Sequence, residues 1–323
     1  MSFSRRDLVR LAAGAGALAA APRRASALDY PKRSIRLIVG FPAASGPDIV
    51  ARLMGHWLST QIGQEVIVDD RPGAGGNIAT EVVAKAAPDG YTLLLTVSAN
   101  TINVTLYDKL NFDFARDLVP VGFIALNPFV IAVNPDFAAK SLPELIAMAK
   151  AKPGVINMAT SGVGSGSHVS GELMQMMAGI KFTHVPYRNN YVPDLLAGQV
   201  PLAFTPLPQV IEFVKDGRLR ALGVTSAQRS SMLPDVPAIA EAVPGYDASG
   251  WFGVTAPKGT PEEIIAKLNA AISAGVQDPE MRKRLIALGD EPRTMTPSEF
   301  GKFITDEIAK WRKVIEFAGI KPQ

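Results

Sequence analysis

Cysteine is absent from the 323 residues, and histidine occurs only at positions 56, 168 and 184. Without cysteine the chain forms no disulfide, thiolate nucleophile or zinc–thiolate site, and it has no cysteine to carry a lipid anchor. A site of several imidazoles would have to gather histidines from distant parts of the chain. We therefore expect neither a metal nor a cofactor.

Long hydrophobic runs are also missing, because no stretch reaches the roughly 20 apolar residues of a membrane-spanning helix. The nearest candidate, residues 11–21, is short and rich in alanine and glycine. It follows Arg5-Arg6 and precedes Ala25-Ser26-Ala27, a small-residue cleavage pattern. This order resembles a twin-arginine signal peptide over residues 1–27, with Leu8 where phenylalanine is usual. It predicts export to the periplasm, and the alternative is an amphipathic helix of the folded protein.

The chain without this leader has no large excess of charge of either sign. The whole chain carries a formal charge of +3, with 33 basic and 30 acidic side chains. The leader holds five arginines and one aspartate, so the remaining residues carry about −1. No basic cluster remains that could follow a phosphate backbone, and we expect no nucleic-acid partner.

Short β-rich runs alternate with amphipathic segments from residue 34 onward. The first series predicts strands at 35–41, 65–69 and 91–97, with helices at about 48–62 and up to 85. A second series predicts strands at 129–135, 155–161, 182–187, 201–207 and 219–226, with helices at 141–154 and about 168–178. This βα order favours an α/β fold of mostly parallel sheets with helices on both faces.

The length predicts two α/β units. The strand and helices after residue 250 have no sheet of their own, and we expect them to rejoin the first unit. The predicted domains are therefore residues 28–126 plus 250–323 (lobe one) and 127–249 (lobe two), joined by two connections. Such an arrangement predicts a hinge and an interlobe cleft.

Two loops of small residues, each between a strand and a helix, are the candidate ligand sites. They are "FPAASGPD" (41–48) and "ATSGVGSGSH" (159–168). Loops at the carboxyl ends of parallel strands lead into helix N-termini, whose unpaired amides favour anions. Asp48 could instead only stabilise its own helix, and Trp251 and Phe252 could be hinge or core aromatics instead of a stacking platform.

The second loop lacks the complete pattern of several known motifs. A phosphate-binding loop would need a lysine, a dinucleotide fingerprint would need glycine at Ser167, and neither Ser165 nor Ser167 completes a nucleophile elbow. Ser165 and His168 could touch as a catalytic pair, yet we find no acid placed to orient the ring. The remaining alternatives are an anion site of amides and hydroxyls, a plain helix cap at Ser165 or Ser167, and a surface role for His168.

The chain resembles the Bug family, the periplasmic solute-binding proteins of tripartite tricarboxylate transport systems. The resemblance runs over the whole mature chain, through "YPKRSIRLIVGFPAASGPDIVARLM", "VIVDDRPGAGGNIATEVVAKAAPDGYTLLL", "TINVTLYDKLNFDFARDLVPV", "MATSGVGSGSHVSGELM", "LPDVPAIAEAVPGY" and "WFGVTAPKGTPEE". It implies a type II periplasmic binding protein, which is not an enzyme and whose two α/β lobes close on a small carboxylate. It also implies membrane transporter subunits, or a sensor, as partners of a monomer. A Ser/His hydrolase and a scaffold with an empty cleft are the alternatives.

The resemblance also implies a set of ligand-binding residues. They are Pro42, Ala43, Ala44, Asp48 and Ser98 from lobe one, and Ser161, Gly162, Gly164, Ser165 and His168 from lobe two. The chain departs from the family at Ala44-Ser45, where a glycine run is usual, and at "RNNYVPDLL" and "FTPLP". Arg188 and Tyr191 are therefore either specificity contacts or part of a solvated loop.

Overall fold

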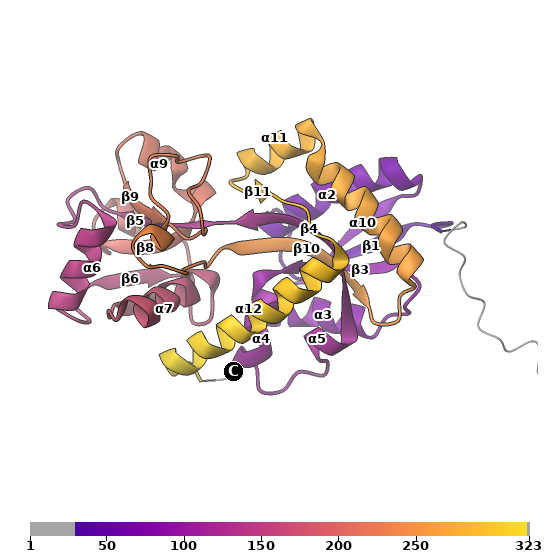
Figure 1. Cartoon of the computed structure of the whole chain (residues 1–323), viewed down its shortest axis with the longest axis horizontal. Coiled ribbons are helices and arrows are strands. Elements are labelled where there is room, and N and C mark those ends of the chain that lie inside the picture. The colour runs from indigo at the N-terminus through magenta and orange to yellow at the C-terminus, as the bar shows by residue number, and fades with distance from the viewer. Residues whose placement is uncertain (1–29, 322–323) are drawn as a thin grey trace, which may run out of the picture.

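The computed structural model describes residues 30–321, so the predicted leader of residues 1–27 lies outside the described residues. Residues 30–321 form two lobes, each built on one β-sheet with helices packed around it (Figure 1). None of the helices in this range combines the length and apolar character needed to cross a membrane.

The first lobe contains a six-stranded sheet in the order β11-β4-β10-β3-β1-β2. Its strands are β1 (Ile35–Val39), β2 (Val66–Asp70), β3 (Thr92–Val97), β4 (Leu118–Asn127), β10 (Gly250–Pro257) and β11 (Glu291–Pro292). The helices around it are α2 (Gly46–Ile62), η3 (Ala74–Gly76), α3 (Asn77–Ala84), α4 (Ser98–Leu106), α5 (Phe114–Asp117), α10 (Glu262–Gln277) and α11 (Pro279–Ala287). Leu37 of β1 and Leu93 of β3 are completely buried, as expected for strands covered on both faces.

The second lobe contains a five-stranded sheet in the order β7-β6-β8-β5-β9. Its strands are β5 (Phe129–Val133), β6 (Asn157–Thr160), β7 (Thr183–Pro186), β8 (Leu202–Pro206) and β9 (Arg220–Val224). Its helices are α6 (Leu142–Ala151), α7 (Gly166–Ala178), α8 (Val192–Leu196), η4 (Leu207–Gln209), α9 (Ile211–Lys215) and η5 (Ile239–Glu241).

Both sheets are mixed, so the prediction of mostly parallel sheets is wrong. β1 is parallel to β2 and β3, and β6 is parallel to β7 and β8. In contrast, β10 is antiparallel to β3 and β4, β11 to β4, and β5 to β8 and β9. For β5 and β10 the reason is the path of the chain between the lobes. β5 and β10 each arrive directly from the other lobe, so they begin at the edge of the sheet where the parallel strands end.

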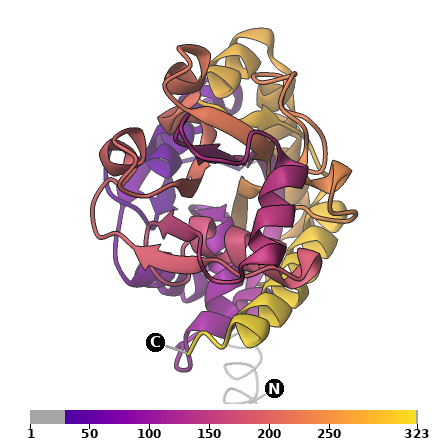
Figure 2. The same cartoon turned by 90° about the vertical axis from the view of Figure 1, so that its left-hand side faces the viewer.

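The long helix α12 (Pro297–Ala318) packs against both lobes (Figures 1 and 2). Its first half buries Phe300, Ile304 and Ile308 in a core cluster of the first lobe. Its second half buries Trp311, Val314 and Ile315 in the main core of the second lobe. The chain also passes between the lobes at Asn127-Pro128 and again before Gly250, and Asn127 and Gly250 are paired residues of β4 and β10.

Glu307 lies between these two halves of α12 and is 5% exposed. Its Oε2 atom accepts hydrogen bonds from the indole of Trp311 at 2.8 Å and from that of Trp251 in β10 at 3.3 Å. Lys310 forms an ion pair with its other oxygen. The buried carboxylate of Glu307 therefore links α12 by a hydrogen bond to β10, a central strand of the first sheet.

Candidate functional site: a cavity between the lobes

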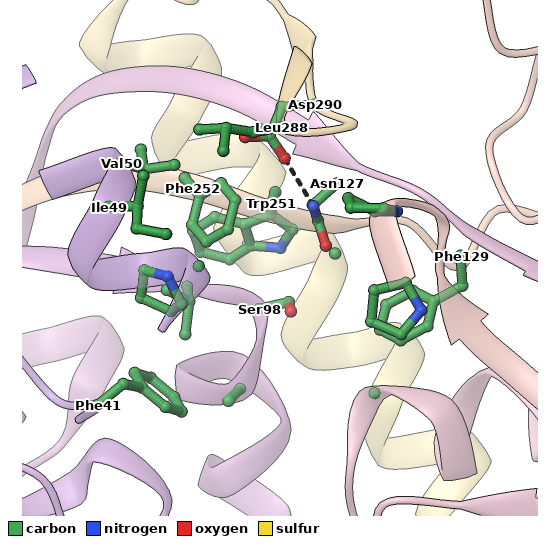
Figure 3. A pocket seen from close by; sticks show the side chains of 18 of the residues that line it. Phe41, Ile49, Val50, Ser98, Asn127, Phe129, Trp251, Phe252, Leu288 and Asp290 are labelled. Atoms are coloured by element: carbon green, nitrogen blue, oxygen red, sulfur yellow. Dashed lines mark hydrogen bonds between the residues drawn. The ribbon is translucent and has the colours of Figure 1, made fainter. Parts of the chain in front are cut away.

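A cavity of about 580 Å³ lies between the lobes (Figure 3). The first lobe contributes Phe41, Gly46, Pro47, Ile49, Val50, Val97, Ser98, Ala99, Trp251, Phe252, Leu288 and Asp290, and the second lobe contributes Phe129, Ser161, Gly166, Pro206, Pro208 and Gln209. Asn127 and Gly250 line it where the chain passes between lobes. The cavity thus lies beyond the carboxyl ends of β1, β3, β6 and β8, where α/β folds bind ligands.

The first residues of three helices line this cavity. They are Gly46 of α2, Ser98 of α4 and Gly166 of α7. The first amides of a helix have no acceptor within it, and the helix dipole places partial positive charge there. The lining residues include no lysine, arginine or histidine, so the positive potential comes from the backbone. Such a cavity can hold an anion through amides and hydroxyls alone.

Two of the ten predicted ligand residues, Ser98 and Ser161, line the cavity. The other eight do not, and they are Pro42, Ala43, Ala44, Asp48, Gly162, Gly164, Ser165 and His168. The first loop reaches the cavity through Phe41, Gly46 and Pro47, and the second through Ser161 and Gly166. The two predicted loops therefore meet at one cavity, but apart from Ser161 through residues outside the predicted set, and the direct ligand contacts of that set stay a prediction.

Asp48 shapes the first loop from within. Its side chain is buried, and its Oδ2 accepts a hydrogen bond from the Ala44 amide at 2.7 Å. Arg52 forms an ion pair with it at 2.7 Å. Burial alone would raise the pKa of Asp48, but the hydrogen bonds from Arg52 and Ala44 outweigh it and lower the pKa. Arg52 also pairs with Asp70 at 2.9 Å, so its single positive charge offsets only part of the repulsion that Asp48 would exert on an anion.

Ala44 has a left-handed backbone, with φ of 62°. This conformation costs an L-residue about 1–2 kcal/mol, and glycine avoids that cost. We expect Ala44→Gly to raise the free energy of unfolding by about 0.5–1 kcal/mol, as measured by urea denaturation. Ala43→Gly is the matched control, because Ala43 is exposed and its φ is not positive. Equal stabilities of the two variants would contradict the prediction.

Most backbone amides of the second loop donate hydrogen bonds to acceptors within the same loop. Ser165 Oγ accepts from the His168 amide at 3.3 Å and donates to the Gly162 carbonyl at 2.7 Å. Ser167 Oγ accepts from the Ser161 amide, and His168 Nδ1 accepts from the Gly164 amide. Ser165 is therefore the cap of α7. Within residues 30–321, the first two amides of α7, those of Gly166 and Ser167, are left without an acceptor.

Ser165 and His168 do not form a nucleophile–base pair. One ring nitrogen of His168 is occupied by the Gly164 amide, and the other lies 3.5 Å from Glu172 Oε1. Glu172, one turn along α7, is thus an acid beside the ring that the sequence analysis overlooked. The His168 ring also stacks on His184 at 3.8 Å, and burial together with the charge of His168 lowers the pKa of His184 to about 4. These contacts give His168 a role in holding the loop.

Several cavity residues are absent from the predicted set. Trp251 and Phe252 belong to hydrophobic cores and also line the cavity. They are therefore core aromatics, as one interpretation held, and they also present a surface to the cavity. Pro206 and Pro208, in the segment that departs from the family pattern, line it as well. Arg188 and Tyr191 do not. Across residues 30–321, no group of three or more histidine, aspartate or glutamate side chains could hold a metal ion.

Comparison with known proteins places this chain in a family of receptors. A family profile described as the tripartite tricarboxylate transporter family receptor matches residues 50–320. Protein BugT of Bordetella pertussis is 39% identical over 301 residues, which is 92% of each chain. The resemblance to the Bug family is therefore confirmed.

Solved structures extend the comparison to the fold. The structure named R. palustris Rpa4515 with adipate is 36% identical, with a TM-score of 0.78, and the match covers 91% of this chain and 100% of that one. MatC from Rhodopseudomonas palustris with bound malate is 30% identical, with a TM-score of 0.72 over 88% and 100%. The predicted fold, a two-lobed type II periplasmic binding protein, is confirmed, and the family is one of receptors, not of enzymes. The chain belongs to the tripartite tricarboxylate transporter receptor family.

Proposed function

We propose that this protein is a periplasmic solute-binding protein that captures a small carboxylate between its lobes. The observation that carries the proposal is the convergence of the α2, α4 and α7 N-termini on one cavity without a cationic side chain. Amides and the hydroxyls of Ser98 and Ser161 would bind the carboxylate from both lobes. The adipate and malate found in the two relatives support this class of ligand.

Closure of the lobes would couple binding to transport. The donors come from both lobes, so the ligand is fully bound only in the closed state and shifts the population toward it. Hydrogen bonds to a charged group contribute about 1.5–3 kcal/mol each, so a handful of them is enough for micromolar affinity. The closed monomer would deliver its ligand to membrane transporter subunits or to a sensor, after export by the twin-arginine leader of residues 1–27.

A thermal-shift screen of dicarboxylates, tricarboxylates, aromatic acids and amino acids tests this function. A bound acid at 100 times its Kd stabilises the folded state by about 2.7 kcal/mol, and we expect the melting temperature to rise by several degrees. Replacing Ser98 and Ser161 together with alanine should weaken that acid about 10- to 100-fold in calorimetry. Ser298→Ala, at an exposed serine of α12, should leave affinity unchanged. No shift with any acid would favour a scaffold with an empty cleft.

A further inference from the structure

Asp290 is the one acidic residue among those that line the cavity, and it is 2% exposed. It lies between α11 and β11, at the wall shared with Leu288 and Asn127 (Figure 3). Its Oδ1 atom accepts a hydrogen bond from Asn127 Nδ2 at 2.6 Å. Within residues 30–321, no hydrogen bond reaches its Oδ2 atom or Asn127 Oδ1, and neither atom belongs to the fully buried unpaired side-chain atoms, so both can be reached from the cavity. Two acceptor oxygens on the cavity wall are therefore available to a ligand.

The surroundings of Asp290 supply no counter-charge. The groups from other elements that contact it are Asn127 of β4, whose side chain donates to its carboxyl group, and Leu285 of α11, whose carbonyl accepts from its amide; neither titrates. The ionisable groups beside it are carboxylates, namely Glu291, which follows it in the chain, and Asp247, whose charge acts on Glu291. Burial raises the pKa of Asp290 to about 7, and only the hydrogen bond from Asn127 opposes this. A buried carboxyl group in this state is strongly stabilised by a cation.

Given the proposed function, we propose that Asp290 and Asn127 form a second subsite that binds a protonated amino group of the ligand. The preferred ligand is then an amino acid whose carboxylate meets the three helix N-termini and whose ammonium group lies against Asp290. An ammonium group has three donors and no acceptor, which matches two free acceptor oxygens. A second carboxylate of the ligand at this place would face only acceptor oxygens. Its binding is therefore disfavoured at any pH at which Asp290 is ionised.

Calorimetry at pH 8 tests this specificity. The probes are ω-amino acids of three to eight carbons together with leucine and phenylalanine, each compared with its analogue that lacks the amino group. We expect the best amino acid to bind at least tenfold more tightly than its analogue. Asp290→Asn should abolish this advantage while the analogue still binds. Glu291→Gln is the matched control, because Glu291 neighbours Asp290 in the chain yet does not line the cavity, and it should keep the advantage.

The pH dependence of the unmodified protein provides a second readout. Below pH 7 a proton competes with the ammonium group for Asp290, so the affinity for the amino acid should fall about tenfold between pH 8 and pH 6. The affinity of the analogue should change little, and that of a dicarboxylate should rise. If acids bind but no amino acid gains over its analogue, or the gain survives in Asp290→Asn, the second subsite is wrong. If no acid binds at any pH, the proposed function itself fails.

Discussion

Gly46→Trp should fold normally and bind its acid at least 100-fold more weakly, a loss of roughly 2.8 kcal/mol. Gly46 is exposed, is the first residue of α2 and lines the cavity. A Cβ atom added there has no neighbouring atom within 4 Å, so a side chain can begin at this position without a clash. An indole at this position would occupy the cavity beside the α2 amides and exclude the carboxylate. Calorimetry with the tightest acid of the screen measures the effect.

Gly46→Ala separates the bulk of the side chain from the loss of glycine. A methyl group leaves the cavity open and suits a helix better than glycine does. Its affinity should stay within a few-fold of the unmodified protein, and its stability should be equal or slightly higher. Full binding by Gly46→Trp would show that the ligand is held elsewhere.

Glu307→Ala should lower the free energy of unfolding by about 3–5 kcal/mol. The change leaves the indole N–H groups of Trp251 and Trp311 buried without their acceptor and leaves Lys310 without its ion-pair partner. An unsatisfied buried donor costs about 1–3 kcal/mol, and the removed side chain leaves a void among aromatic rings. Urea denaturation followed by circular dichroism measures the loss.

Two further substitutions on α12 test the cause of this loss. Glu307→Gln keeps an acceptor oxygen and nearly the same volume, so it should cost less than half as much. Glu316→Ala removes an exposed glutamate from the same helix and should change stability by under about 0.5 kcal/mol. Equal effects at positions 307 and 316 would mean that the buried hydrogen bonds contribute nothing.

Local patterns predicted most elements within a few residues. The apolar runs gave strands at 35–41 and 91–97, and the structure has β1 at Ile35–Val39 and β3 at Thr92–Val97. No element was assigned to β4, because Pro120 and Gly122 interrupt its pattern and its partner β10 lies far away in the chain. Strand direction depends on where the chain enters each sheet, which periodicity does not record.

The loops that form the cavity could be found from the sequence, but the residues that line it could not. Small residues before helices marked both loops, whereas the inward turn of Asp48 and His168 toward loop amides depends on side-chain geometry. Asp290 follows a helix in "LGDEP", a pattern typical of a turn. Its position in the cavity depends on Asn127, which is 163 residues away in the chain.

The placement of α12 determines how the molecule can open. Separating the lobes along this helix would expose Trp311, Val314 and Ile315, and large apolar side chains cost about 1.5–3 kcal/mol each when they leave a core. Rotation of the two lobes about α12 leaves the apolar side chains of both halves of the helix buried in their cores. We therefore expect the lobes to open by rotation about α12, so that solute reaches the cavity without either half of the helix leaving its core.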